Sequence, residues 1–113
     1  MLQAQILTGL LVAVLAGCAG ERDYDRHRMS RIGTTASDPG AWLYEAQIDP
    51  KYPAESAAAE AMRMEWLDDW MERGQYCADG YEVVERREFA ADEPNPYGSD
   101  LRYLVKCADE PDD

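Results

Sequence analysis

The residues that could carry chemistry are few and scattered. The only histidine, His27, lies in a polar, charged stretch with no apolar framework to hold a catalytic base in place. The adjacent carboxylates Asp68 and Asp69 are weak evidence for acid–base catalysis, because a chain with 23 acidic residues brings such pairs together by chance. No glycine-rich phosphate loop and no spacing typical of zinc or calcium sites occurs in the sequence. The sequence therefore predicts that the protein is not an enzyme and holds no metal or cofactor.

The most specific motif lies near the N-terminus. An apolar run over residues 6–15 ends in Leu15-Ala16-Gly17-Cys18. This ending resembles the lipobox of bacterial lipoproteins, which implies that residues 1–17 are a removed signal peptide and that Cys18 carries the lipid, with a fatty acyl chain such as palmitate on its amine. A run of about ten residues is too short to span a bilayer and has the length of a signal peptide's apolar core. The first five residues depart from the pattern because they contain no Lys or Arg; the alternative is an apolar N-terminal helix with a chance cysteine.

The resemblance also indicates a location. Residue 19, the one after the lipidated cysteine, is Ala rather than Asp, which by similarity to proteobacterial lipoproteins favours anchoring in the outer membrane. The domain is expected on the periplasmic face, with exposure at the cell surface as the alternative. Two further cysteines, Cys77 and Cys107, remain in the exported part of the chain. In an oxidising compartment, two cysteines in a small domain are expected to form one disulfide.

A formal net charge of −12 limits the partners of this domain. Such a surface repels nucleic acid phosphates and anionic lipid headgroups, so DNA and RNA are excluded as partners. It could attract cationic proteins, peptides or divalent cations. A high-GC or salt-adapted source would explain the acidity equally well.

The sequence divides into four parts. After the signal peptide, residues 18–39 are expected to be the lipidated cysteine and a flexible tether, because they are polar and lack an apolar period. Residues 40–108 are expected to form one small domain, and residues 109–113 an acidic tail. The mixed-charge block over residues 23–31 could instead dock against something else.

Within the domain, alternating apolar residues predict a strand over residues 41–48. A helix is expected over residues 53–73, with Gly74 as its C-terminal stop. Two more strands are expected over residues 81–89 and 101–107. The predicted fold class is α+β, in the order β-α-β-β, with one long amphipathic helix packed on a three-stranded, mainly antiparallel sheet.

The disulfide predicts a strand register as well. If Cys77 faces Cys107, then Tyr81 faces Tyr103 and Val83 faces Leu101, which places apolar pairs on one face. A bulge at Asp79-Gly80 could shift this register by one.

The helix has two surfaces to consider. Its predicted core stripe is Ala59, Met62, Trp66 and Trp70, with Ala58 and Leu67 at the edges. Outside this stripe lies a candidate partner surface made of an acidic flank and a small apolar strip: Glu65, Asp68, Asp69 and Glu72, and Met64, Leu67 and Met71. The alternatives are a solvated acidic face, and an apolar strip that is covered by the 41–48 segment or the tether. The turn with Pro94, Pro96 and Tyr97 is a third candidate, because binding residues favour loops on a rigid scaffold, although a flexible hairpin tip would look the same.

These features together predict a membrane-anchored lipoprotein that acts as a non-catalytic interaction or accessory module of the cell envelope, with an envelope protein as its partner. The alternative in another class is an inhibitor or scavenger of cationic proteins or peptides. Salt distinguishes the two surfaces, because binding through the acidic flank should weaken steeply with ionic strength and docking through the apolar strip should not.

Overall fold

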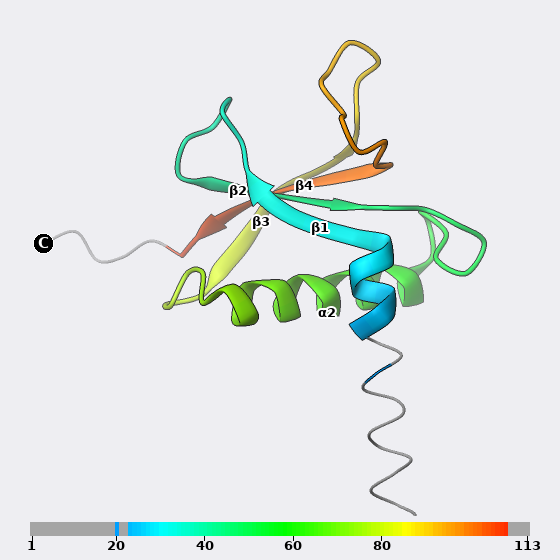
Figure 1. Ribbon diagram of the computed structural model, residues 1–113, viewed down its shortest axis with the longest axis horizontal. Coiled ribbons are helices and arrows are strands. Elements are labelled where there is room, and N and C mark those ends of the chain that lie inside the picture. The colour runs from blue at the N-terminus through cyan, green and yellow to red at the C-terminus, as the bar shows by residue number, and fades with distance from the viewer. Residues whose placement is uncertain (1–19, 21–22, 109–113) are drawn as a thin grey trace, which may run out of the picture.

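The computed structural model describes residue 20 and residues 23–108 (Figure 1). The predicted signal peptide, the lipidation at Cys18 and the acidic tail lie outside these residues. Among the described residues, no helix is both long and apolar enough to cross a membrane. The elements are a helical segment over residues 23–29, then β1 (Ser30–Thr34), β2 (Ala41–Ala46), α2 (Ala57–Gly74), β3 (Tyr81–Glu88) and β4 (Leu101–Cys107).

The predicted α+β class is confirmed, but the sheet has four strands rather than three. Its order is β1-β2-β4-β3, and every neighbouring pair is antiparallel. In Figure 1, α2 runs along one side of this sheet, and the long loop between β3 and β4 rises on the other side. The core lies between α2 and the central strands, where Trp66 and Leu67 pack with Tyr44, Tyr103 and the rest of the buried cluster.

The predicted flexible tether over residues 18–39 is wrong from residue 23 onward. Residues 23–34 form the helical segment and the edge strand β1, with Asp25, Arg26 and Met29 buried. Polar contacts to distant residues hold the segment in place: the Tyr52 hydroxyl donates a 2.5 Å hydrogen bond to Asp25, and the Arg26 guanidinium lies 4.9 Å from the Trp70 ring centroid. Since these partners are far away in the sequence, a search for local apolar periodicity misses them. The folded domain therefore includes residues 23–39 and does not begin at residue 40.

α2 begins and faces the core somewhat differently from the prediction. Ser56 is its N-cap and accepts a hydrogen bond from the Ala59 amide, so Pro53 lies before the helix. Ala59 and Trp66 are buried as predicted, but Met62 and Trp70 are only half-buried. The buried face is turned toward the side of the helix that carries Arg63, Leu67 and Met71.

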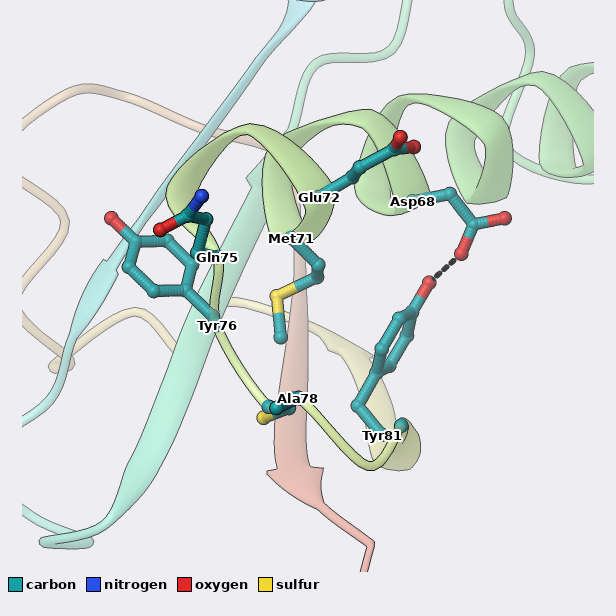
Figure 2. Close-up of a pocket in the computed structure, with 9 residues that line it drawn as sticks. Asp68, Met71, Glu72, Gln75, Tyr76, Ala78 and Tyr81 are labelled. Carbon is teal, nitrogen blue, oxygen red and sulfur yellow. Dashed lines mark hydrogen bonds between the residues drawn. The ribbon is translucent and has the colours of Figure 1, made fainter.

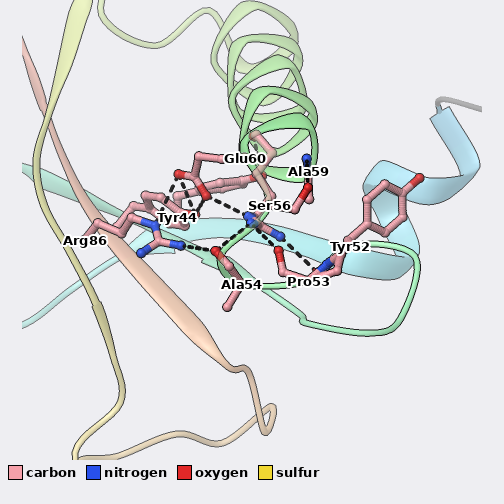
Figure 3. A network of polar contacts seen from close by, with 10 residues as sticks. Tyr44, Tyr52, Pro53, Ala54, Ser56, Ala59, Glu60 and Arg86 are labelled. Atoms are coloured by element: carbon pink, nitrogen blue, oxygen red, sulfur yellow. Dashed lines mark hydrogen bonds and ion pairs between the residues drawn. The ribbon is translucent and has the colours of Figure 1, made fainter.

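Arg63 explains this rotation, because it is fully buried and bonded to the loop before α2. Figure 3 shows the polar network to which that loop and Glu60 belong. Its guanidinium donates to the carbonyl oxygens of Tyr52, Pro53 and Ala54 at 3.2, 3.0 and 3.4 Å. It also donates to the Glu60 carboxylate at 2.9 Å. A buried arginine is tolerated where most of its donors are occupied, and the four bonds of Arg63 fasten the loop before α2 to the helix.

The predicted disulfide between Cys77 and Cys107 is present, with the two Cα atoms 4.9 Å apart. The register derived from it is wrong. Tyr81 pairs with Cys107 and Val83 with Val105, and a bulge between Val83 and Glu85 shifts the pairing once more. The reason is that Cys77 lies in a turn with φ 55°, closed by the Gly80 amide donating to the Cys77 carbonyl, rather than in the strand.

Candidate functional site

The predicted partner surface divides into a part that is exposed and a part that is not. The apolar strip is wrong as a surface: Leu67 is 0% and Met71 is 3% exposed, because both belong to the core beneath α2, and Met64 is half-buried. The acidic flank remains largely outside, with Glu65, Asp68 and Glu72 exposed and Asp69 half-buried. A partner therefore cannot dock on the apolar strip, because Leu67 and Met71 are buried.

Two residues of the acidic flank border a groove at the C-terminal end of α2, here called the α2-end groove (Figure 2). Its volume is about 460 Å³. In Figure 2 the Met71 side chain lies between the rings of Tyr76 and Tyr81, and the Tyr81 hydroxyl donates a hydrogen bond to Asp68. The groove is lined by Asp68, Met71, Glu72, Gln75, Tyr76, Cys77, Ala78, Gly80 and Tyr81.

The C-terminal cap of α2 shapes this groove. Gln75 takes a left-handed conformation with φ 56°, and its amide donates to the Glu72 carbonyl while the Tyr76 amide donates to the Met71 carbonyl. These two bonds are the Schellman pattern, which turns the chain back and packs Tyr76 near Met71. Gly74 fits for steric reasons, because a Cβ there would lie 2.2 Å from the Tyr76 ring. The predicted stop at Gly74 thus has the right position, although the left-handed residue is Gln75.

The electrostatics of the α2-end groove favour a positive group. Asp68 and Glu72 contribute two carboxylates, and the C-terminal end of a helix carries the negative end of its dipole. Burial, together with the hydrogen bond to Asp68, raises the pKa of Tyr81, so its hydroxyl keeps its proton and stays a donor. The rings of Tyr76 and Tyr81 add aromatic surface that attracts a cation, with one face of Tyr76 taken up by Trp42, which stacks on it at a centroid distance of 4.0 Å.

A second concavity lies on the other face of the sheet, beneath the β3–β4 loop, and is here called the far-face cleft. Its volume is about 590 Å³. Its floor includes Leu43 and Glu45, which alternate along β2 with the core residue Tyr44 and therefore face away from α2. The loops contribute Phe89, Glu93, Pro94, Pro96 and Tyr97 from one side and residues 34–37 from the other.

A row of charged residues crosses the sheet at the floor of the far-face cleft. The strand registers pair Arg31 with Glu45, Glu45 with Arg102, and Arg102 with Arg87. Glu93 reaches down from the loop, accepts hydrogen bonds from Arg87 at 2.8 and 2.9 Å, and also pairs with Arg102.

The contacts of Glu93 also change its pKa. The hydrogen bonds from Arg87, together with one from the Ala90 amide, lower the pKa of Glu93 to about 2. At the entrance, the Arg31 guanidinium lies 3.1 Å from the centroid of the Tyr97 ring, and its Nε lies 3.6 Å from a Glu45 oxygen. The cleft is therefore a fixed arrangement of alternating charges with apolar walls.

The sequence alone indicates only some of the residues that line this cleft. The turn with Pro94, Pro96 and Tyr97 was a candidate, and these residues do line the cleft. The row of Arg31, Glu45 and Arg102 was missed, because nothing in the sequence aligns three separate strands without knowledge of their register.

Among residue 20 and residues 23–108, no group of three or more His, Cys, Asp or Glu side chains is placed to hold a metal ion. Comparisons with known protein families, curated proteins and solved structures found no match to this chain.

Proposed function

We propose that the chain is a lipid-anchored, non-catalytic interaction module of the bacterial cell envelope, and that its partner inserts a cationic side chain into the α2-end groove. The observation that carries this proposal is the groove itself: two carboxylates, two tyrosine rings and a helix C-terminus converge on one concavity. A lysine or arginine from an extended segment of the partner matches all three features.

The anchor rests on the resemblance of Leu15-Ala16-Gly17-Cys18 to a lipobox, and anchoring in the outer membrane rests on Ala19. The domain is compatible with this setting, since it is small and stapled by one disulfide. From Cys18 to residue 23 the chain spans at most about 18 Å when fully extended. A partner would therefore meet this domain close to the membrane surface.

The anchor is tested with Cys18→Ala. Radiolabelled palmitate should label the unaltered protein in cells and should not label the variant, which should leave the membrane fraction. Continued labelling of Cys18→Ala would contradict the lipoprotein assignment and would leave the groove untouched.

The groove is tested by cross-linking of the lipidated protein in intact cells, followed by mass spectrometry of the captured proteins. A photoreactive residue at position 72, on the rim, should capture one dominant envelope protein, and the same residue at position 55, an exposed acid at the other end of α2, should not. Glu72→Gln should weaken the complex several-fold and reduce its salt dependence, with Glu55→Gln as the matched control. Equal capture at both positions would argue against the groove.

A second candidate function is an inhibitor or scavenger of soluble cationic proteins or peptides, and the net charge of −12 favours it. This function uses the same acidic surface but needs no fixed envelope partner. It gains support if cross-linking in cells recovers no dominant protein while a lysozyme-like enzyme or a cationic antimicrobial peptide binds the purified protein tightly at low salt and weakly at physiological salt.

A further inference from the structure

We propose that the free edge of β1 pairs with the same edge of a second copy of this chain, so that two domains share one continuous antiparallel sheet. This interface is separate from the α2-end groove and needs no envelope partner. The strand pairing does not depend on the lipid anchor, and only the orientation of the two copies on a membrane rests on that proposed anchor.

The two edge strands of the sheet, β1 and β3, differ in how well they resist pairing. β3 has a bulge between Val83 and Glu85, and five of its eight residues are Glu or Arg. Bulges and charged side chains are the usual means by which an edge strand avoids another strand. β1 pairs regularly with β2 over its five residues and carries one charged side chain, Arg31. β1 is therefore the edge that is open to another strand.

The hydrogen bonds of β1 show which of its backbone groups face outward. The Gln47 amide donates to the Met29 carbonyl, and these two residues continue the β1–β2 register by one position. Hydrogen-bonded pairs alternate along an antiparallel ladder, so residues 31 and 33 bond to β2. Three residues turn their amide and carbonyl groups away from β2: Ser30, Ile32 and Thr34.

The outward groups of β1 are available to a second strand. Among the residues that the structure describes, no hydrogen-bond partner is found for the outward groups of Ile32 and Thr34. In Figure 1, β1 crosses in front of the other strands, and no other element is drawn over it. An unpaired row of amide and carbonyl groups is a template for another strand.

A two-fold axis at Ile32 brings these outward groups of two copies together. Ile32 then faces Ile32 of the second copy, and Ser30 faces Thr34 on both sides of the axis. Opposite residues of a hydrogen-bonded pair exchange two bonds, so each of these three pairs can form two. A register shifted by one residue would set outward groups against residues that already bond to β2, and would lose these bonds.

The side chains fit this register on both faces of the sheet. On the face away from α2, Arg31 lies opposite Gly33 of the second copy. The space beside Gly33 is open, because a Cβ there would meet no atom within 4 Å. On the α2 face, Ile32 is half-buried against the core, and the two Ile32 side chains meet at the axis, where each can cover the other.

Charge directs a second copy to this edge rather than to another face. With a formal net charge of −12, two copies repel each other over most of their surface. Residues 26–37 contain no Asp or Glu, so no carboxylate of β1 itself opposes the pairing. The Arg31 charge is balanced by Glu45, whose carboxylate lies 3.6 Å away. More distant carboxylates are screened at physiological ionic strength, where the Debye length is about 8 Å.

The symmetry also suits two chains that are anchored in one membrane. The two-fold axis is perpendicular to the shared sheet, so both α2 helices lie on the same face. The helical segment over residues 23–29 lies on that face too, since Arg26 lies over the Trp70 ring and Asp23 pairs with Arg73. Both chains therefore enter the shared sheet from one side, and both proposed anchors can reach the same bilayer.

The small size of the interface indicates where the dimer should form. Pairing of two five-residue strands buries less than the roughly 1,200 Å² of a standard stable interface. Tethering of both partners raises their effective concentration, to the millimolar range for short flexible links. We therefore expect a dimer at the membrane or at high protein concentration, and monomers in dilute solution.

Amide hydrogen exchange of the unaltered, full-length, isotope-labelled protein tests the pairing. Spectra are recorded in detergent micelles at a low and at a high ratio of protein to detergent. The Ile32 and Thr34 amides should exchange at least about tenfold more slowly at the high ratio. The Arg31 and Gly33 amides, which already bond to β2, are the internal control and should change little. Equal exchange of the Ile32 and Thr34 amides at both ratios would overturn the proposal.

Cross-linking in cell membranes tests the register. Opposite residues of a hydrogen-bonded pair have Cα atoms about 5.5 Å apart, which is a distance that a disulfide can span. Under a mild oxidant, Ile32→Cys should therefore link two copies. Val84→Cys, at an exposed position of the β3 edge, is the matched control and should not. Cross-linking of Val84→Cys as strong as that of Ile32→Cys would show random collision and count against the proposal.

A proline at an outward-facing amide separates edge pairing from the fold. Thr34 is exposed and its amide faces outward, so Thr34→Pro removes a donor to the second copy and leaves the β1–β2 bonds in place. It should reduce the Ile32→Cys cross-link at least about tenfold, because the symmetry removes two hydrogen bonds. Thr34→Ala keeps the amide and should leave the cross-link unchanged. Equal cross-linking in the two variants would refute the pairing, and Cys18→Ala tests the anchor separately, since it leaves the slowed exchange in micelles intact.

Discussion

Replacing Arg63 with methionine tests the most unexpected feature of the core. The side chain is fully buried and donates four hydrogen bonds, three to the carbonyl oxygens of the loop before α2 and one to Glu60. Methionine fills the space of the arginine stem but is shorter and has no donor, so Arg63→Met removes all four bonds. The three carbonyl oxygens are then left with their weaker or outer partners, the Asp49 amide, the Ser56 amide and the Arg86 guanidinium. Glu60 retains its contacts with Tyr103 and Arg86.

The magnitude follows from these contacts. A hydrogen bond to a charged group contributes about 1.5–3 kcal/mol, so the loss of all four bonds should cost at least about 3 kcal/mol. A single small domain has a free energy of unfolding of about 5–15 kcal/mol. We therefore expect Arg63→Met to remove roughly a fifth or more of the total stability and to loosen the loop over residues 49–56.

Urea unfolding followed by circular dichroism measures this loss, and Arg73→Met on the same helix is the matched control. The side chain of Arg73 is 59% exposed and pairs with Asp23 at 3.1 Å, so its replacement should cost less than about 1 kcal/mol. If Arg63→Met lost no more than Arg73→Met, the idea that buried hydrogen bonds of Arg63 fasten the loop to α2 would be wrong.

Three further predictions concern the groove, the staple and the cleft. Gln75→Gly should raise the free energy of unfolding by about 0.5–1 kcal/mol, because glycine adopts the left-handed conformation at this position without strain; a lower melting temperature would contradict that reasoning. Replacing both Cys77 and Cys107 with serine should cost roughly 3.5 kcal/mol in the chain-entropy model for a loop closed over a separation of 30, measured by urea unfolding against the oxidised protein, and a loss below 1 kcal/mol would show that the disulfide adds little. The pKa of Glu93 is lowered in the folded state to about 2, so its contribution to stability is present above the unfolded pKa of about 4.3 and is lost as the pH falls toward 2. Glu93→Gln should therefore flatten the fall in the free energy of unfolding between about pH 5 and pH 2. An unchanged pH profile would count against the Arg87–Glu93 contact.

Local patterns in the sequence determined much of the fold. The alternation in residues 41–48 and 101–107 and the long helical stretch before Gly74 identified β2, β4 and α2 to within a few residues. These predictions succeeded because each depends on neighbours a few positions apart. The pairing of Cys77 with Cys107 followed from counting cysteines in a chain expected to be exported.

Long-range contacts decided the rest. Residues 23–34 belong to the domain because Asp25 and Arg26 bind Tyr52 and Trp70, partners that no local window contains. The core face of α2 is turned because the loop carbonyls satisfy Arg63, a residue that any hydrophobicity pattern assigns to the surface.

The candidate sites show the same division. The sequence alone gave the acidic flank of α2, but only the tertiary structure buried Leu67 and Met71 and brought Asp68 and Glu72 to the rim of a groove with Tyr81. The far-face cleft required the register of the strands, since a shift of one residue would move Glu45 and Arg102 to the opposite face. Residue types and their spacing thus determined the elements, and pairing across the sheet decided which charged groups meet.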